Sequence, residues 1–116
     1  MEKEKTFLID GYGRPTTTVV KDKDGKAVNP GDVVEVKHCV GRYGQTETVR
    51  GTFVKATVYG VHLIFNKPYT RNGRNGLYTY PAEEEVQFAI SQRDGVFYDK
   101  HNDFEHGHET YMLKIG

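Results

Sequence analysis

The stretch of this sequence that decides the fold is Gly31-Asp32-Val33-Val34-Glu35-Val36-Lys37-His38-Cys39-Val40. Its side chains alternate, so that one face carries Val34, Val36, His38 and Val40, and the other carries Val33, Glu35, Lys37 and Cys39. A period of two is typical of a β-strand with one buried face. We therefore expect a strand here, which begins after the turn Asn29-Pro30-Gly31-Asp32.

Outward from this stretch, short strand-like segments separated by turn residues fill most of the chain. A hairpin is predicted around Asp24-Gly25, since this dipeptide suits a tight primed turn. Gly51 lies inside a long Thr- and Val-rich segment, as expected for a strand that bends or bulges. The further expected strands cover residues 6–9, 16–20, 26–28, 46–58, 61–65, 77–80, 96–98 and 110–115.

The segment Pro81–Gln92 fits two structures. Pro81 followed by Glu83, Glu84 and Glu85 resembles the first turn of a helix, with acids at the positive end of its dipole. However, Val86, Phe88 and Ile90 alternate with Gln87 and Ala89, as in a strand. We favour the strand and expect at most one short helix, within residues 81–92.

Composition also favours an all-β fold. The length of 116 residues is typical of one domain, and no repeat or linker divides the chain. We therefore expect a single domain over residues 1–116. The eight Tyr and six Phe suit a pleated surface, and the 13 Gly suit a fold with many turns. The expected architecture is a small barrel or a compact sandwich of short antiparallel strands.

The middle of the chain resembles the SH3-like small barrels. The resemblance covers roughly residues 31–90 and consists of three bent segments and a closing one: Gly31–Val36, Val49–Val54 with Gly51 at the bend, Gly60–Phe65 and Tyr80–Ala89. It implies an SH3-like barrel. Because such barrels bind proteins, peptides and nucleic acids alike, the resemblance does not select one function.

Charge and cysteine content exclude several classes of protein. Sixteen basic and sixteen acidic residues give a net charge of zero, which argues against attachment to nucleic acid by bulk charge. Cys39 is the single cysteine, which excludes an intramolecular disulfide and a Cys-rich metal site, and we expect it to be a small buried residue. The segment Met1–Lys5 does not resemble a signal peptide, and no apolar run approaches the ~20 residues that span a bilayer. We expect a cytoplasmic protein without membrane contact.

A His-rich segment, Asp99–Glu109, offers the main enzyme-like feature. Its imidazoles, His101, His106 and His108, are weak candidates for metal ligands, and a metal-dependent enzyme is one alternative function. No established zinc spacing is present, and we favour an exposed polar loop. No phosphate-binding loop or other catalytic motif is present, so neither a cofactor nor catalysis is expected.

Residues Asn66–Gly76 form the longest segment that we expect to be irregular, and it combines basic and aromatic side chains. Such residues contact protein partners, and they also hold single-stranded nucleic acids by charge and stacking. We predict a non-enzymatic binding module for a protein partner, such as an accessory or modulator protein encoded by a phage or mobile element; nucleic-acid binding is the alternative. The predicted contact residues are Lys67, Tyr69, Arg71, Arg74, Tyr78 and Tyr80, with Arg42 and Tyr43 nearby and Arg50 also in reach.

Overall fold

The computed structural model describes residues 6–39, 46–73, 76–102 and 107–116, and for residues 71–73, 101, 102, 107 and 108 the backbone alone. These parts of the chain form ten strands and no helix, which confirms the all-β prediction. The strands are β1 (Phe7–Ile9), β2 (Pro15–Val19), β3 (Val33–Cys39), β4 (Thr46–Thr57), β5 (Gly60–Ile64), β6 (Tyr69–Gly73), β7 (Gly76–Tyr80), β8 (Glu85–Phe88), β9 (Tyr98–Asn102) and β10 (Gly107–Lys114).

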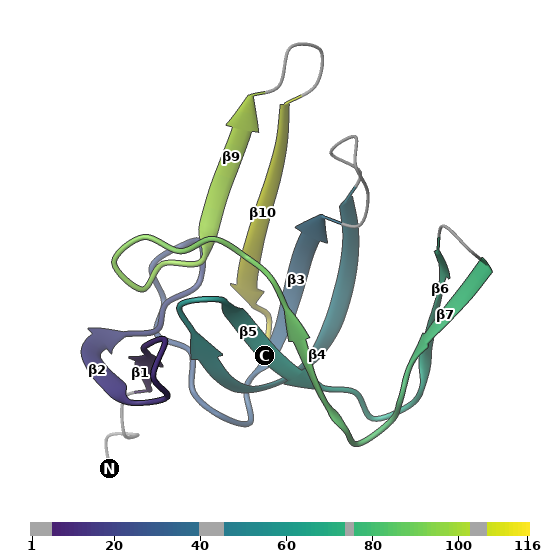
Figure 1. The fold of residues 1–116 in the computed structure, drawn as a ribbon, viewed down its shortest axis with the longest axis horizontal. Coiled ribbons are helices and arrows are strands. Elements are labelled where there is room, and N and C mark those ends of the chain that lie inside the picture. Colours follow the sequence, from purple (N-terminus) through teal and green to yellow (C-terminus); the bar gives the residue numbers. More distant parts are fainter. Residues whose placement is uncertain (1–5, 40–45, 74–75, 103–106) are drawn as a thin grey trace.

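Eight strands form one strongly curled sheet, and β6 and β7 form a separate hairpin beside it (Figure 1). The order along the sheet is β2-β1-β4-β3-β10-β9, with β5 on β4 and β8 on β5. The 12-residue strand β4 organises this arrangement because it pairs with β3 along Thr46–Thr52 and with β5 along Thr52–Thr57. The curled sheet is compatible with a small barrel.

The alternation predicted for β3 is confirmed. Val34, Val36 and His38 are buried, whereas Val33 and Cys39 are exposed. The expectation that Cys39 is buried was wrong, because strand parity puts its side chain on the outer face of the sheet. Val40 lies outside the described residues.

Strand β4 has the irregularity that its sequence predicted, although Gly51 is not the site of the register shift. The shift lies between Phe53 and Lys55. Gly51 allows a close approach, since a Cβ atom at this position would lie 3.3 Å from Cε1 of Phe65.

The segment 81–92 contains a strand, β8, as we favoured, and no helix. Phe88 and Ile90 are buried, while Gln87 and Ala89 are exposed, so the predicted alternation holds. The ring of Phe88 packs among those of Phe65 and Tyr80, with centroids 6.0 and 5.3 Å away. This tertiary burial outweighs the local helix signal of the acidic residues.

The fully buried carboxylate of Asp22 connects the predicted turn at Asp24-Gly25 to the last strand. Its Oδ1 accepts hydrogen bonds from the N–H groups of Asp24 and Lys26, and its Oδ2 accepts one from the N–H of Lys114, each at 2.9 Å. Three charge-assisted hydrogen bonds offset the cost of burying this carboxylate.

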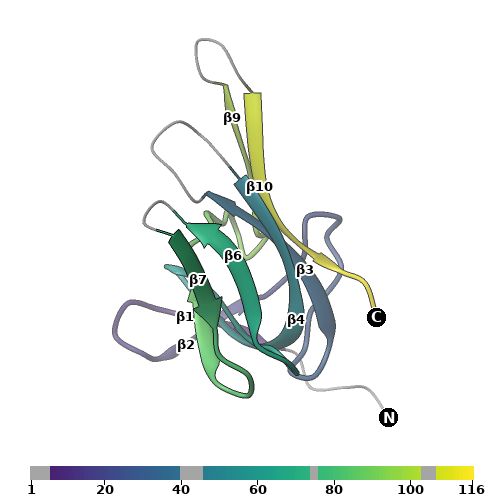
Figure 2. The same cartoon turned by 90° about the vertical axis from the view of Figure 1, so that its right-hand side faces the viewer.

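The prediction of an irregular segment over 66–76 was wrong for most of its length. Tyr69–Gly73 forms β6, which pairs with β7 in the register Tyr69↔Tyr80 through Gly73↔Gly76. The hairpin leaves the sheet after β5 and stands apart from it (Figures 1 and 2). Asn72 and Gly73 end β6 and Gly76 begins β7, and these turn-forming residues explain why the stretch resembles a loop.

Candidate binding site

A stack of aromatic rings attaches the β6–β7 hairpin to the core. The rings of Phe65, Tyr69 and Tyr80 stack with centroids 5.7 to 6.1 Å apart. Phe65 follows the end of β5, whereas Tyr69 and Tyr80 face each other at the base of the hairpin. Isolated two-stranded hairpins are marginally stable, so this stack holds the hairpin in place.

Beyond the stack, the hairpin exposes apolar area. Tyr78 is 51% exposed and Leu77 is 75% exposed, whereas Tyr80 is only 5% exposed. Tyr78 packs edge-on against Tyr80, with ring centroids 5.0 Å apart. Thr70 and Thr79, paired across the hairpin, join their hydroxyl groups at 3.0 Å. A braced hairpin therefore presents a large tyrosine ring and a leucine side chain to solvent.

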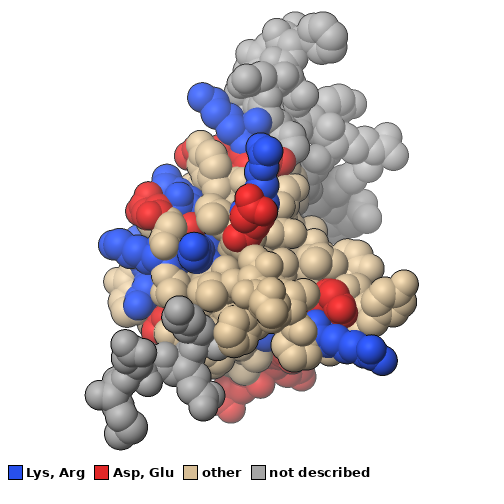
Figure 3. Space-filling view, turned by 90° about the vertical axis from the view of Figure 1, so that its left-hand side faces the viewer, with Lys and Arg blue, Asp and Glu red and all other residues tan. Residues whose placement is uncertain are grey.

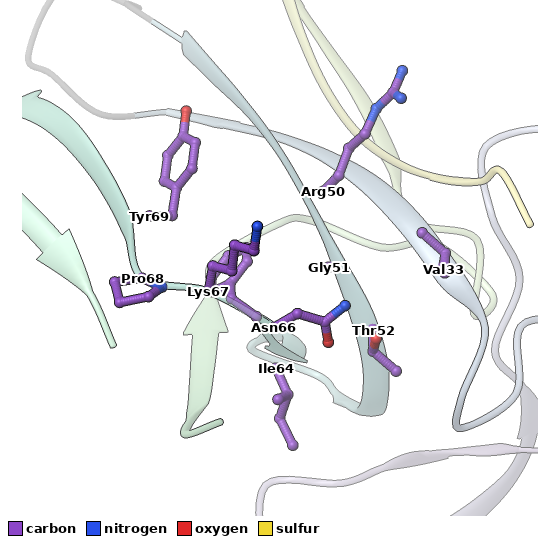
Figure 4. Close-up of a pocket in the computed structure, with 10 residues that line it drawn as sticks. Val33, Arg50, Gly51, Thr52, Ile64, Asn66, Lys67, Pro68 and Tyr69 are labelled. Atoms are coloured by element: carbon purple, nitrogen blue, oxygen red, sulfur yellow. The ribbon is translucent and has the colours of Figure 1, made fainter. Parts of the chain in front are cut away.

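A groove of about 380 Å³ lies between the base of the hairpin and the middle of β4 (Figure 4). Arg50, Gly51 and Thr52 form one side, and Tyr69 rises from the strand on the other side (Figure 4). Two cationic side chains, Arg50 and Lys67, line the groove, and its lining contains no carboxylate. The remaining lining residues are Val33, Ile64, Phe65, Asn66 and Pro68.

Arg50 is oriented by a carboxylate on the neighbouring strand. Oε1 of Glu35 accepts hydrogen bonds from Nε and Nη2 of Arg50 at 3.3 and 3.2 Å. Oε2 of Glu35 accepts a hydrogen bond from the Tyr111 hydroxyl at 2.9 Å. Burial, with this hydrogen bond, raises the pKa of Tyr111 to about 12, so the phenol remains a donor at neutral pH. The Arg50 side chain is still 67% exposed and available to a ligand.

The structure brings together four of the predicted contact residues, namely Lys67, Tyr69, Tyr78 and Tyr80. Arg50 of β4, which was expected to lie in reach, lines the same groove as Lys67 and Tyr69. Arg71 lies opposite Tyr78 in the backbone register. Arg42, Tyr43 and Arg74 lie outside the described residues. The contributions of Val33 and Ile64 to the groove were not predicted from the sequence, because only the tertiary fold places these strand residues next to Lys67.

The candidate metal ligands lie at the ends of β9 and β10 or outside the described residues. His101 and His108 are directly paired in the register of β9 and β10, and His106 lies outside the described residues. Within the described ranges, no group of three or more His, Cys, Asp or Glu side chains could hold a metal ion.

Two other histidines are paired with carboxylates. Nε2 of His38 lies 3.0 Å from Oε2 of Glu47 on the inner face of the sheet, and the His38 ring packs edge-on against Phe88. Nδ1 of His62 lies 3.1 Å from Oε1 of Glu85. Burial is the largest effect on His62 and lowers its pKa below 6.5, although the Glu85 carboxylate opposes this shift. Both arrangements fit structural roles.

A second cavity, of about 360 Å³, was not anticipated from the sequence. It is lined by Cys39, Val58, Tyr59, Ala89, Ile90, Ser91 and Thr110. Elsewhere, on the face drawn in Figure 3, basic and acidic side chains are interspersed around a broad uncharged area. The described residues of this face therefore form no single-sign patch of the kind that binds polyanions by charge alone.

The comparisons with known proteins define no class for this chain. The scan against family models, the search of curated proteins and the search of solved structures each give no match. The described residues contain no helix of the length and apolarity needed to cross a membrane.

Proposed function

We propose that this chain is a non-enzymatic binding module that recognises a protein partner through the β6–β7 hairpin and the adjoining groove. The observation that carries the proposal is the exposure of Tyr78 and Leu77 on a hairpin anchored by stacked rings. Tyrosine supplies large, rigid contact area at low entropic cost, and tyrosine and arginine are enriched in binding hot spots. Recognition by a pre-ordered hairpin also limits the entropy lost on association.

A nucleic acid is the second candidate ligand. Lys67 and Arg50 lie beside Tyr69. Proteins that bind single-stranded nucleic acids combine positive charge with an aromatic stacking surface in this way. We favour protein because Arg50 is already paired with Glu35 and because the chain has no net charge. Both features reduce the electrostatic attraction on which binding to a polyanion depends.

The proposal places the chain among accessory proteins, which act by occupying a surface of a larger complex. The SH3-like pattern over roughly residues 31–90 is consistent with this role, since small barrels of that kind bind proteins and peptides. A phage or mobile element is a source that would suit such a modulator.

Affinity capture with the tagged full chain tests the proposal. The bait is compared with a double variant, Leu77→Ser with Tyr78→Ala, which removes the exposed apolar area of the hairpin. The control is Tyr12→Ala, because Tyr12 is 92% exposed but lies outside both the hairpin and the groove.

We expect one protein to be retained by the wild-type chain and by the Tyr12 variant after nuclease treatment, and to be lost with the double variant. If nuclease treatment abolishes capture of the protein, the ligand of the chain is a nucleic acid. If the double variant still captures the protein, the exposed side chains of the hairpin do not form the contact surface.

A further inference from the structure

One edge of β4 is paired with a neighbouring strand along only part of its length, among the described residues. On the side opposite β3, strand β5 covers β4 from Thr52 to Thr57. From Thr52 back to Thr46, none of the described strands pairs with that edge, because β5 ends at Ile64 and the chain turns away. The β6–β7 hairpin stands on this side of β4 (Figure 1), and the groove lies between its base and β4.

Hydrogen bonds around Phe53 identify the backbone groups that this edge presents. The N–H of Phe53 donates to the backbone O of Asp32 at 2.8 Å, and the backbone O of Phe53 accepts from the N–H of Gly31 at 3.0 Å. The backbone N–H and C=O groups of Phe53 therefore point toward the β3 side of the strand. Backbone groups alternate between the two edges of a strand. The N–H and C=O groups of Thr48 and Arg50 therefore point toward the uncovered edge.

We propose that this edge binds an extended peptide segment of the protein partner as an added β-strand, with an acidic side chain placed at Arg50 and Lys67. The inference rests on the proposed function and specifies its chemistry. Strand addition gives affinity through main-chain hydrogen bonds and specificity through pockets for alternate side chains. The groove beside Gly51 and Tyr69 is such a pocket at the end of the uncovered edge.

The charges of the groove determine the chemistry of the peptide. Its lining has two cations and no carboxylate, and no ion pair of Lys67 occurs among the described residues. Arg50 shares its charge with Glu35, so the groove lining retains about one uncompensated positive charge, that of Lys67. An Asp or Glu side chain complements this charge, and an apolar neighbour two residues along fits beside Tyr69.

The backbone geometry favours a peptide over the other occupants. A nucleic acid lacks the regular alternation of N–H and C=O groups that pairs with a strand edge. A second copy of this chain would bring like charges together, because Arg50 and Lys67 flank the edge in each copy. Both alternatives are outcomes of the test below.

The probe is a synthetic peptide chosen by phage display of random linear sequences on the immobilised full chain. Thr48→Pro removes the edge N–H at a position whose side chain is exposed, and Thr48→Val is the matched control that retains this N–H. Lys67→Glu is compared with Lys26→Glu, an equal charge change at an exposed site in the Asp22–Lys26 turn. Affinities are measured by calorimetry, and the folding of each variant by its melting curve.

We expect selected peptides that alternate apolar and polar residues around an Asp or Glu. Thr48→Pro should weaken binding roughly tenfold or more, and Thr48→Val should leave it nearly unchanged. Lys67→Glu should weaken binding several-fold, whereas Lys26→Glu should not. If Thr48→Pro does not fold, N-methylation of the peptide, one amide at a time, must weaken binding to the wild-type chain at alternate positions.

The proposal is overturned if no peptide is selected, or if the selected peptide binds equally well after N-methylation and to Thr48→Pro. It is also overturned if the chain pairs with itself in sedimentation and Thr48→Pro prevents this association. In these cases a partner captured through Leu77 and Tyr78 would still support the proposed function. Binding of single-stranded oligonucleotide instead of peptide would contradict both.

Discussion

The α-carbon of Gly51 lies so close to the ring of Phe65 that a Cβ atom on this glycine would stand 3.3 Å from Cε1 of the ring. The same Cβ would lie 3.2 Å from the backbone oxygen of Ile64. This contact fixes where β5 leaves β4, and Phe65 in turn stacks on the tyrosines that anchor the hairpin. The floor of the groove and the position of the hairpin thus depend on the absence of a side chain at residue 51.

Gly51→Val should destabilise the fold by about 1–3 kcal/mol, because extra methyl groups cannot be accommodated beside backbone atoms without a shift. Gly51→Ala should cost less, since the loss of chain entropy in the unfolded state offsets part of the steric cost by about 0.4–1 kcal/mol. Denaturant unfolding measures both. A Val variant as stable as the wild-type chain would show that this contact does not constrain the fold.

Asp22→Ala should cost about 3 kcal/mol or more, since three backbone N–H groups lose a buried acceptor. Asp22→Asn should be intermediate, because one carbonyl oxygen still accepts two of these bonds while the NH₂ group faces the N–H of Lys114. The control is Asp24→Ala, an exposed site for which a change within about 0.5 kcal/mol is expected. Equal unfolding free energies for the Asp22 and Asp24 variants would contradict the role assigned to Asp22.

Substitutions at Tyr78 and Tyr80 should have different effects, the first mainly on partner binding and the second mainly on the free energy of unfolding. Tyr80→Ala should reduce the free energy of unfolding by about 3–5 kcal/mol, as expected for a buried aromatic ring. Tyr78→Ala should cost far less stability but should weaken partner binding by about 1–3 kcal/mol. Calorimetry measures binding by the two variants, and denaturant unfolding measures their stability. If Tyr80→Ala weakened binding and Tyr78→Ala mainly reduced stability, Tyr80 and not Tyr78 would be the contact residue.

Stability should fall on acidification in a way that depends on His62. Burial lowers the pKa of this imidazole in the folded state below 6.5, and Lys55 adds to the shift although Glu85 opposes it. The unfolded chain then binds the proton more readily, so stability decreases as the pH falls below about 6.5 and levels off below the folded-state pKa. His62→Gln should show less of this loss between pH 7 and 5, and Glu85→Gln should show more. Parallel stability curves for the wild type and His62→Gln would exclude this contribution.

The strands were predictable where one face is buried. The alternation of Val34, Val36 and His38 identified β3, and that of Phe88 and Ile90 identified β8 despite the acidic residues before it. Local side-chain chemistry was sufficient there, because burial on one face imposes a period of two. For Cys39 the same parity overrode the tendency of cysteine to be buried.

The hairpin and the groove were less predictable. Strand β6 was expected to be irregular because it is rich in polar and turn-forming residues. The support that makes it a strand comes from the ring of Phe65, which follows β5 and is not visible in the local sequence pattern. The groove joins Val33 and Arg50 to Lys67 and Tyr69, which only the curled sheet brings together. The basic and aromatic composition identified Lys67 and Tyr69 as candidates, but no periodicity connected them to β4.

Amide hydrogen exchange of the chain, free and bound to the captured partner, shows whether the partner contacts the hairpin and the β4 edge. We expect slower exchange on binding at Leu77–Tyr80, at Lys67 and Tyr69, and at the edge amides of Thr48 and Arg50. The amides around the second cavity, at Val58, Tyr59 and Ser91, should be unchanged. Protection confined to that second cavity, with unchanged exchange along the hairpin and the β4 edge, would show that the partner binds there and not at the hairpin.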